Sequence, residues 1–474
     1  MAIAVTTRSY DNTRSGSNTQ ETVLTAGNVA THGVRRLFSL QLPGDKRGAE
    51  AQPLVVPGVK LGDGTTREVI YLATMANRVF AFDAANGNPL WNRTLGTPVQ
   101  SNSAIDSFPI NDHWGVLGTP VIDRATGTMY VVAWVSQDGS VGNAQHFLHA
   151  LDIHDGSPKG QPLNLEAAVF DAGHGLPQLQ FHSAKRKQRA SLLLTSVGGV
   201  TTVFVGFGSL QETSARSRGW VIACGTAPFE VTAAWASTVR FHGAGIWQAG
   251  AGIAADPDGF IYLMTGNGGF DGVTDWGESF VKLKYAPPSR GKKAFLAVVD
   301  WWTPWTDDAR SGIDPDAQFD AEGSPTNFRA YEKLAKAAAQ RAGEWADMDL
   351  GSGGPVLIPS HGVVVGAGKD GILYVLDQHN MGKTKPGDLD NPAGNYAKLK
   401  SPPIFFTYFP PTLNPAPNDI ASLNVLFGQL SHHLHGNPLF WDSPDLGPAL
   451  YCWGENGNLR AWSVGNNGKV TYLA

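Results

Sequence analysis

"EVIYLATMANRVFAFDAANGNPLWNRTLG" (residues 68–96) is the stretch that decides the fold of this 474-residue chain. It reads as three short strands in meander order. An apolar strand at 69–73 leads through a polar turn at 75–77 to a second strand at 78–83, and a turn that closes at Gly87 leads to a third. Apolar alternation between such turns is typical of antiparallel strands. The stretch predicts one antiparallel meander, and its recurrence decides what the meander belongs to.

The same cadence of strands and turns returns five more times. Each copy follows an aliphatic run with Gly or Pro, which is the candidate innermost strand. Because four-stranded units repeated around an axis build a β-propeller, we expect an all-β propeller of four-stranded antiparallel blades, with six blades recognisable and six to eight possible. A β-sandwich is the alternative, but six copies of one strand order are hard to fit into it. The six units occupy residues 50–96, 118–158, 189–235, 250–285, 351–382 and 435–468.

The amino-acid composition agrees with such a fold and argues against two kinds of partner, nucleic acid and a membrane. The chain has 56 Gly, 30 Pro and 14 Trp but only 16% charged residues, which suits many tight turns and buried aromatic rings. A net charge of −5 offers no basic face for nucleic acid, and no apolar run approaches the length of a membrane span. The first residues lack the pattern of a signal peptide. We therefore expect either an extracytoplasmic or secreted protein whose leader has been removed, or a cytoplasmic one.

The repeat predicts a single propeller domain over residues 1–474, interrupted by an acidic and helical insertion at 306–345. Thr326 can cap a helix that follows it, and Gly343 can end that helix. Two other segments compete for the outer strand of the last blade, namely 33–44 and 469–474. The sequence leaves the closure of the ring open between them.

One repeat carries a recognisable motif. "VFAFDAANGNPLW" (79–91) matches A-x-D-x-x-x-G-x-x-x-W, and partial copies stand at 147–156 and 372–382. The chain resembles the PQQ-like repeat family of quinoprotein-like β-propellers, and its opening at 9–29 is similar to the start of such proteins. That resemblance implies a propeller in which the motif Trp docks between neighbouring sheets. The family includes PQQ-dependent dehydrogenases and also scaffold propellers that bind no quinone.

Propeller geometry predicts which loops meet. In a four-stranded meander, the loop before the inner strand and the loop between the second and third strands open on one face. Residues far apart in sequence therefore converge around a central funnel, where we expect a small polar, hydroxyl-bearing or carbohydrate ligand. The loops before the inner strands contribute Arg189, Trp247, Gln248, Asp349 and the histidines His432, His433 and His435; the other loops contribute Asn267, Lys369, Glu455 and Asn456.

"QLSHHLHGNPLFW" (429–441) places three histidines ahead of an apolar run. In an extended chain, His433 and His435 project to the same side. Such a pair is half of a metal site, for which Asp347 or Asp349 could supply an oxygen ligand. The alternatives are a polar contact to a ligand and a structural bond to a backbone carbonyl.

The resemblance also implies a cofactor. PQQ carries three carboxylates that need cations such as Arg189 and Lys369, and its ring needs an aromatic floor such as Trp247 or Trp453. An inter-blade ion pair for Arg189 and inter-blade packing for the two tryptophans are the alternatives. Quinone dehydrogenation further requires a divalent cation, usually Ca²⁺, and a carboxylate base. The candidates are catalytic Asp349, His433 and His435; cofactor-binding Arg189, Lys369, Trp247, Gln248 and Trp453; and metal-binding Glu455, Asn456 and Asn267.

Three functions stay open. The first is a quinoprotein-like oxidoreductase that dehydrogenates an alcohol or sugar with PQQ and Ca²⁺. The second is a non-catalytic propeller that binds a carbohydrate or a protein partner. The third is a metal-assisted hydrolase or lyase that uses the histidines at 432–435. Cys224 and Cys452 form neither a vicinal cysteine pair nor a CxxCH haem motif. Their absence makes the quinoprotein-like oxidoreductase a weaker expectation.

Overall fold

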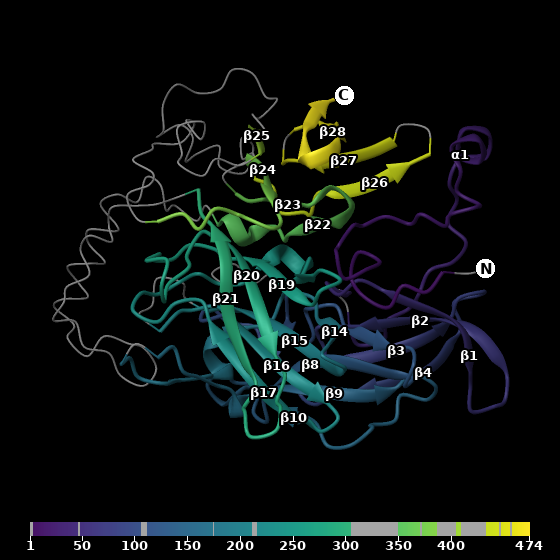
Figure 1. Cartoon of the computed structure of the whole chain (residues 1–474). Helices are drawn as coiled ribbons and strands as arrows, with labels where there is room; N and C mark the ends of the chain where they lie inside the picture. The colour runs from purple at the N-terminus through teal and green to yellow at the C-terminus, as the bar shows by residue number, and fades with distance from the viewer. Residues whose placement is uncertain are drawn as a thin grey trace.

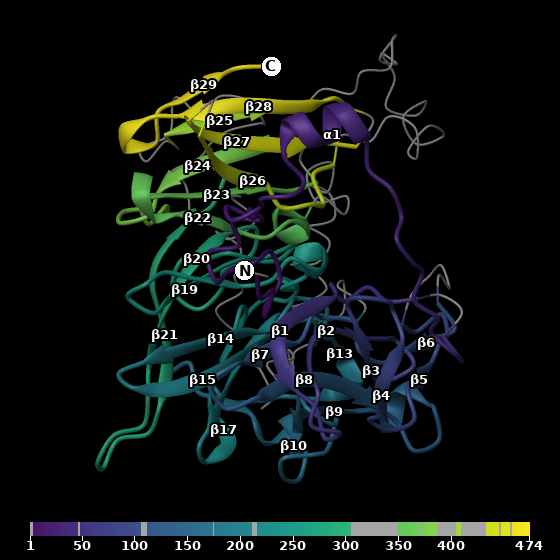
Figure 2. The same ribbon diagram turned by 90° about the vertical axis from the view of Figure 1, so that its right-hand side faces the viewer.

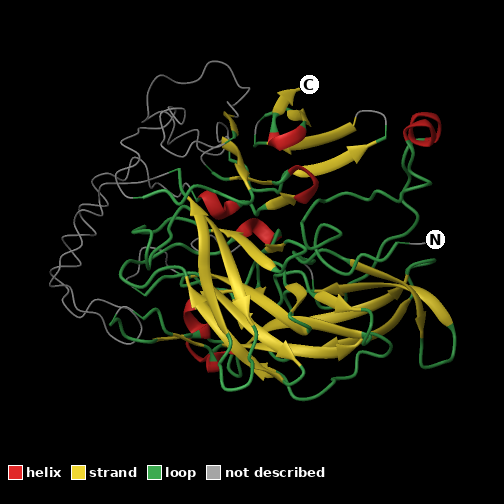
Figure 3. Ribbon diagram, viewed as in Figure 1, coloured by secondary structure: helices red, strands yellow, loops and turns green. Residues whose placement is uncertain are grey.

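Antiparallel strands dominate the computed structural model of this chain (Figures 1 and 3). The structure describes residues 3–45, 48–105, 111–173, 175–210, 216–304, 349–369, 372–385, 404–408, 433–444, 447–455 and 457–474. Within these residues the strands form successive sheets around a common axis. The prediction of an all-β propeller is confirmed, whereas the insertion predicted at 306–345 lies outside the described residues.

Six of the described sheets contain the repeated meander, with the strands in sequence order from the innermost outward. They are β1 (Leu54–Lys60), β2 (Thr66–Ala73), β3 (Arg78–Asp83) and β4 (Pro89–Thr94); β7 (Val121–Asp123), β8 (Thr128–Val135), β9 (Gln145–Asp152) and β10 (Leu163–Asn164); β14 (Leu193–Val197), β15 (Val200–Ser209), β16 (Trp220–Thr226) and β17 (Phe229–Ala236); β18 (Ala254–Ala255), β19 (Phe260–Met264), β20 (Phe280–Ala286) and β21 (Phe295–Trp302); β22 (Val356–Ile358), β23 (Val363–Ala367), β24 (Ile372–Asp377) and β25 (Phe405–Tyr408); β26 (Leu439–Ser443), β27 (Gly447–Trp453), β28 (Leu459–Val464) and β29 (Val470–Tyr472). The other strands are β5 (Val99–Gln100), β6 (His113–Trp114), β11 (Val169–Phe170), β12 (Leu179–Gln180) and β13 (Arg186–Lys187), which pairs with β15.

The repeat that carries the motif joins the first two sheets. Trp91 lies in β4, the outermost strand of the first sheet. Its indole N–H donates to the carbonyl of Ile153 in the second sheet at 3.3 Å. A Cβ on Gly156 would lie 2.6 Å from the Trp91 ring, so only glycine lets the indole pack this closely. The motif Trp docks between neighbouring sheets, as the resemblance implied.

Apolar clusters join each sheet to the next. One cluster joins the first and second sheets, a larger one the second to fourth, and two more continue to the fifth and the sixth. Burial of apolar surface at about 25 cal/mol per Å² is therefore the main force between sheets. Within the described residues, none of these clusters contains both the sixth sheet and the first. Cys224 and Cys452 are buried free thiols in the third and sixth sheets.

The N-terminal segment (residues 5–16) runs through the middle of the molecule, where Figure 2 shows it between the sheets. It forms hydrogen bonds with the innermost strand of all six sheets. Four carbonyls of the segment accept from strand amides, Val5 pairs with Val55 in both directions, and the Asn12 side chain donates to the Leu194 carbonyl at 2.8 Å. The four amide–carbonyl pairs are Ile122 with Thr6, Ala255 with Asn12, Leu357 with Thr13, and Phe440 with Ser15. The segment therefore ties the six innermost strands together.

Arg14 anchors this segment. Its guanidinium is fully buried and donates to the carbonyl of Ile253 from Nε at 2.9 Å and from Nη2 at 2.8 Å. It also donates to the carbonyl of Leu192 and to the Thr7 hydroxyl. Burial lowers the pKa of Arg14 to about 10, so the group stays charged at neutral pH. Charge-assisted bonds to carbonyls of two neighbouring sheets offset the cost of burying this cation.

The chain from Gly16 to Asp45 spans the side between the last sheet and the first. It passes α1 (Ala26–His32), which lies beside the last sheet in Figures 1 and 2, and reaches the first sheet, where the carbonyl of Pro43 accepts from Arg78. The prediction that residues 33–44 form an outer strand is wrong, because this segment forms no strand. It runs to the first sheet and contacts it at Arg78. The last sheet takes β29 from the competing C-terminal segment. No described helix is long and apolar enough to cross a membrane.

His146 is a buried polar group in an aromatic core. Its ring stacks on Trp134 at a centroid distance of 5.2 Å and meets the edge of Phe207. Neither ring nitrogen has a hydrogen-bond partner among the described residues. Burial, helped by the charge of Arg186, lowers the pKa of His146 from 6.5 to about 3. The imidazole is therefore neutral in the folded protein across ordinary pH.

This burial predicts a loss of stability in acid. The unfolded imidazole takes up a proton near pH 6.5 and the folded one only near 3, so the free energy of unfolding should fall as pH drops between these values. From this group the fall is about 1.4 kcal/mol per pH unit. Urea denaturation of wild type and His146→Phe at several pH values between 6 and 4 measures it. The variant should lose that part of the slope, and equal slopes in both proteins would contradict the prediction.

Candidate functional site

Asp349 and Lys369, from two loops of the predicted funnel face, form a largely buried ion pair. Asp349 precedes η6 (Leu350–Ser352) in the loop before β22, and Lys369 follows β23. The Lys369 Nζ lies 2.8 Å from the Asp349 Oδ2, and their side chains are 15% and 3% exposed. The backbone N–H of Lys369 donates to the Asp349 carbonyl at 3.0 Å, and that of Asn267 donates to Oδ1 at 3.0 Å. The pair is therefore held by both main-chain and side-chain bonds.

Two glycines make room for this pair. A Cβ on Gly266 would collide with Oδ1 of Asp349, and a Cβ on Gly368 would lie 2.5 Å from the Cα of Leu350. The turn that contains Gly368 belongs to "GAGKDG", which reads from the sequence as a turn and not as a phosphate loop. The backbone approaches the carboxylate closely only because these positions carry no side chain.

Trp247 and Gln248 lie next to this pair. The Trp247 ring is half-buried and packs on the backbone of Gly245, where a Cβ would lie 2.6 Å from the indole nitrogen. Gln248 begins η4 (Gln248–Gly250), which packs against η6. Its side chain is fully buried, and neither polar atom of its amide has a hydrogen-bond partner among the described residues. A buried amide without hydrogen-bond partners is energetically costly, which sets this position apart from the other side chains of the site.

His433, His435 and Glu455 form a second cluster. The two imidazole centroids are 5.3 Å apart, and the intervening Leu434 is fully buried, as the same-side projection of the H-x-H pair requires. The Glu455 carboxylate lies 3.2 Å from Nε2 of His435 and 3.7 Å from Nδ1 of His433. The backbone N–H of Glu455 donates to the His433 carbonyl at 2.9 Å. This cluster is less buried than the ion pair, since Glu455 is 40% exposed.

Electrostatics connects the two clusters. Burial lowers the pKa of His435, and the positive charges of Lys369 and Arg189 act in the same direction. Glu455 and Asp349 oppose this shift, but less strongly in sum. Four predicted site residues from three different sheets therefore act on one imidazole, and the convergence that propeller geometry predicts is present around His435.

Other predicted residues lie at the margin. Arg189 is 42% exposed, and its Nε is 3.9 Å from the Glu50 carboxylate next to the first sheet, which is the inter-blade ion pair considered from the sequence. Such an exposed, long pair contributes little stability. Trp453 is 68% exposed, and its indole N–H donates to the Gly457 carbonyl. His432 and Asn456 lie outside the described residues.

The structure divides the predicted calcium ligands. Glu455 lies with the imidazoles, whereas the backbone of Asn267 lies with Asp349, and the side-chain oxygen of Asn267 has no hydrogen-bond partner among the described residues. Sequence reasoning missed Glu278, whose buried carboxylate accepts from the Leu350 N–H at 2.7 Å and so positions η6. No local pattern marks that residue, because its role depends on a contact across 72 positions.

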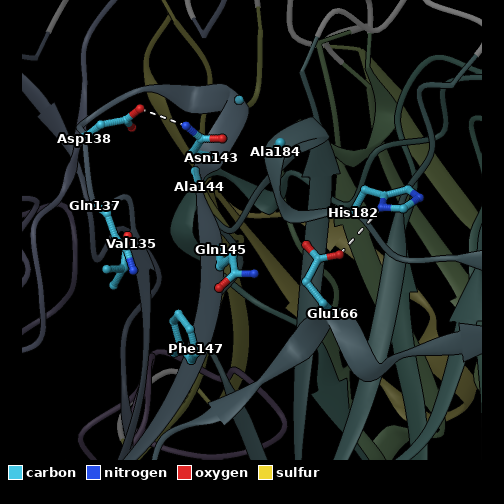
Figure 4. Close-up of a pocket in the computed structure, with 11 residues that line it drawn as sticks. Val135, Gln137, Asp138, Asn143, Ala144, Gln145, Phe147, Glu166, His182 and Ala184 are labelled. Atoms are coloured by element: carbon cyan, nitrogen blue, oxygen red, sulfur yellow. Dashed lines mark hydrogen bonds and ion pairs between the residues drawn. The ribbon is translucent and has the colours of Figure 1, made fainter.

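A pocket of about 730 Å³ lies elsewhere, beside the second sheet (Figure 4). Two polar pairs stand on its wall, Glu166 with His182 at 3.6 Å and Asp138 with Asn143 at 2.8 Å. None of the candidate site residues belongs to its lining. The lining consists of Val135, Gln137, Asp138, Gly142, Asn143, Ala144, Gln145, Phe147, Glu166, His182 and Ala184.

Two solved structures are similar to this chain. A europium-containing methanol dehydrogenase matches with a TM-score of 0.50 and 13% identity, over 99% of this chain and 72% of that one. The quinohemoprotein alcohol dehydrogenase from Comamonas testosteroni matches with a TM-score of 0.52 and 16% identity, over 97% of this chain and 59% of that one. At these identities the likeness shows the β-propeller fold alone. No family model and no curated protein matches the chain.

The Asp349–Lys369 pair predicts a specific stability pattern. Lys369→Met leaves a buried carboxylate without its cation, so the free energy of unfolding should fall by about 3 kcal/mol. Adding Asp349→Asn to that variant removes the unpaired charge, and the double variant should recover part of the loss. Chemical denaturation of the wild type, the two single variants Lys369→Met and Asp349→Asn, and the double variant checks this. A double variant that loses the sum of both single effects would show that the two side chains do not act as a pair.

Proposed function

We propose that the funnel face binds a small polar, hydroxyl-bearing molecule and that the protein is an oxidoreductase that dehydrogenates an alcohol or a sugar. The observation that carries the proposal is the group formed by the Asp349–Lys369 pair, the half-buried Trp247 and the Gln248 amide, which has no hydrogen-bond partner among the described residues. A carboxylate, a cation, an aromatic face and an amide suit a hydroxyl-bearing ligand. The fold that this chain shares with two alcohol dehydrogenases supports the same class.

The residues present fit PQQ. Lys369 and Arg189 are cations for its carboxylates, Trp247 offers a ring face, and the orphaned amide of Gln248 can bond to a polar edge. Bound PQQ would supply the two-electron acceptor that dehydrogenation requires. Asp349 would then accept the hydroxyl proton of the substrate, because a carboxylate that already accepts two bonds keeps further lone pairs. Lys369 would hold that carboxylate in place.

The residues present do not fit Ca²⁺ equally well. Calcium takes six to eight oxygen ligands. Glu455 instead lies between two imidazoles, and Asn267 lies in the other cluster. Calcium therefore has no part in the proposed reaction.

A second candidate function is a non-catalytic propeller that binds a carbohydrate or a protein partner. The observation that favours it is the burial of Asp349, whose side chain is 3% exposed and already accepts from Asn267 and Lys369. A carboxylate in this setting can serve structure alone. The two functions differ in whether bound ligand is oxidised.

Reconstitution with PQQ separates them. The full chain should take up PQQ, show the quinone absorbance band, and reduce an artificial electron acceptor when an alcohol or sugar is added. Asp349→Asn should lower that rate by roughly 100-fold or more, as expected for loss of a general base, while it retains the absorbance band. The exposed Asp442→Asn in β26 is the matched control and should keep the full rate.

Uptake of PQQ without dye reduction would favour the binding propeller. Absence of PQQ uptake in protein that remains folded by circular dichroism would overturn the oxidoreductase.

A further inference from the structure

Three donor atoms come close enough to share one ion. Among the described residues, one group of His, Cys, Asp and Glu side chains brings three potential ligand atoms within 4.8 Å of one another, namely His433, His435 and Glu455. A tetrahedral ion with bonds of about 2.0–2.1 Å holds its ligand atoms about 3.3 Å apart. His435 Nε2 lies 3.2 Å from Oε1 of Glu455 and His433 Nδ1 lies 3.7 Å from Oε2, so each imidazole is near that spacing from one of the two carboxylate oxygens.

The backbone around the three ligands is held firmly. Leu434 is fully buried, its N–H donates to the Gly368 carbonyl at 3.0 Å, and its carbonyl accepts from the Ser352 hydroxyl at 3.1 Å. The bond from the Glu455 N–H to the His433 carbonyl fixes the loop after β27 against the loop before β26. The site therefore stands on a preorganised frame, which lowers the cost of ligand binding.

The donor set selects the class of metal. Two imidazole nitrogens and one carboxylate oxygen suit Zn²⁺ and other late transition metals, whereas Ca²⁺ and Mg²⁺ prefer oxygen ligands. Three protein ligands are also the number found in catalytic zinc sites, which keep a position open for water or substrate.

We infer that His433, His435 and Glu455 bind one transition-metal dication, with Zn²⁺ as its representative, and leave a coordination position open for water or a substrate oxygen. The site lies on the same face as Asp349 and Lys369 but shares no ligand with that pair. It requires no PQQ, so it stands or falls independently of the proposed oxidoreductase.

A simpler account of the cluster is an ion pair between Glu455 and protonated histidines without any metal. Zinc titration of untagged, chelator-treated full-length protein distinguishes the two. Isothermal calorimetry and metal analysis should give one Zn²⁺ per chain with a Kd on the order of 1 μM or tighter, and Ca²⁺ should not compete. Thermal unfolding should shift upward with zinc, because a ligand that binds only the folded state stabilises it.

Variants locate the site. Glu455→Gln, a conservative change at a 40% exposed side chain, and His435→Ala should each weaken zinc binding by roughly 10- to 100-fold or more and remove the thermal shift. His379→Ala, an exposed histidine after β24, is the matched control and should bind zinc as the wild type does. No saturable zinc binding, or equal binding by wild type, Glu455→Gln and His435→Ala, would overturn the inference.

Discussion

Hydrogen bonds between the N-terminal segment and the six innermost strands, backbone to backbone for five of them and through the Asn12 side chain for the third, are the constraint on which the rest of the structure depends. Apolar clusters hold each sheet against its neighbour, but among the described residues they do not join the sixth sheet to the first. The segment at 5–16 contacts all six sheets instead, and Arg14 fixes it to carbonyls of two of them. The loops that carry Asp349 and His435 lead directly into two of these strands, β22 and β26, so the tie fixes the point at which those loops end.

Sequence reasoning recovers the sheets because their signals are local. Period-two alternation and turn residues mark the meander at 68–96, and each predicted innermost run overlaps the innermost strand of its sheet. The N-terminal segment gives no such local signal. It bonds to six strands but forms no strand of its own, apart from a single bridge between Val5 and Val55. Its role depends on partners up to 425 positions away, as between Ser15 and Phe440. For the same reason the apolar residues at 33–44 suggest a strand that the chain does not form.

In the candidate site, too, local features could be predicted from the sequence and contacts between distant residues could not. The same-side projection of His433 and His435 follows from strand geometry and could be predicted, as could the face on which Asp349 and Lys369 lie. The pairing of particular groups could not be predicted, because it depends on how two loops approach each other. Glu455 meets the imidazoles and not an oxygen-rich calcium set, and the buried Gln248 amide has no hydrogen-bond partner within the part of the chain that the structure describes. The Glu455 contact and the buried Gln248 amide decide which chemistry the face can support.

The central tie is tested most directly by amide hydrogen exchange of the full chain. The inner strands form the axis-facing edge of their sheets, so amides that point to the axis would exchange quickly if nothing paired with them. The account predicts that the four amides bonded to the N-terminal segment exchange as slowly as amides within the sheets. Exchange at the rate of exposed loop amides would contradict it. The four amides are those of Ile122, Ala255, Leu357 and Phe440.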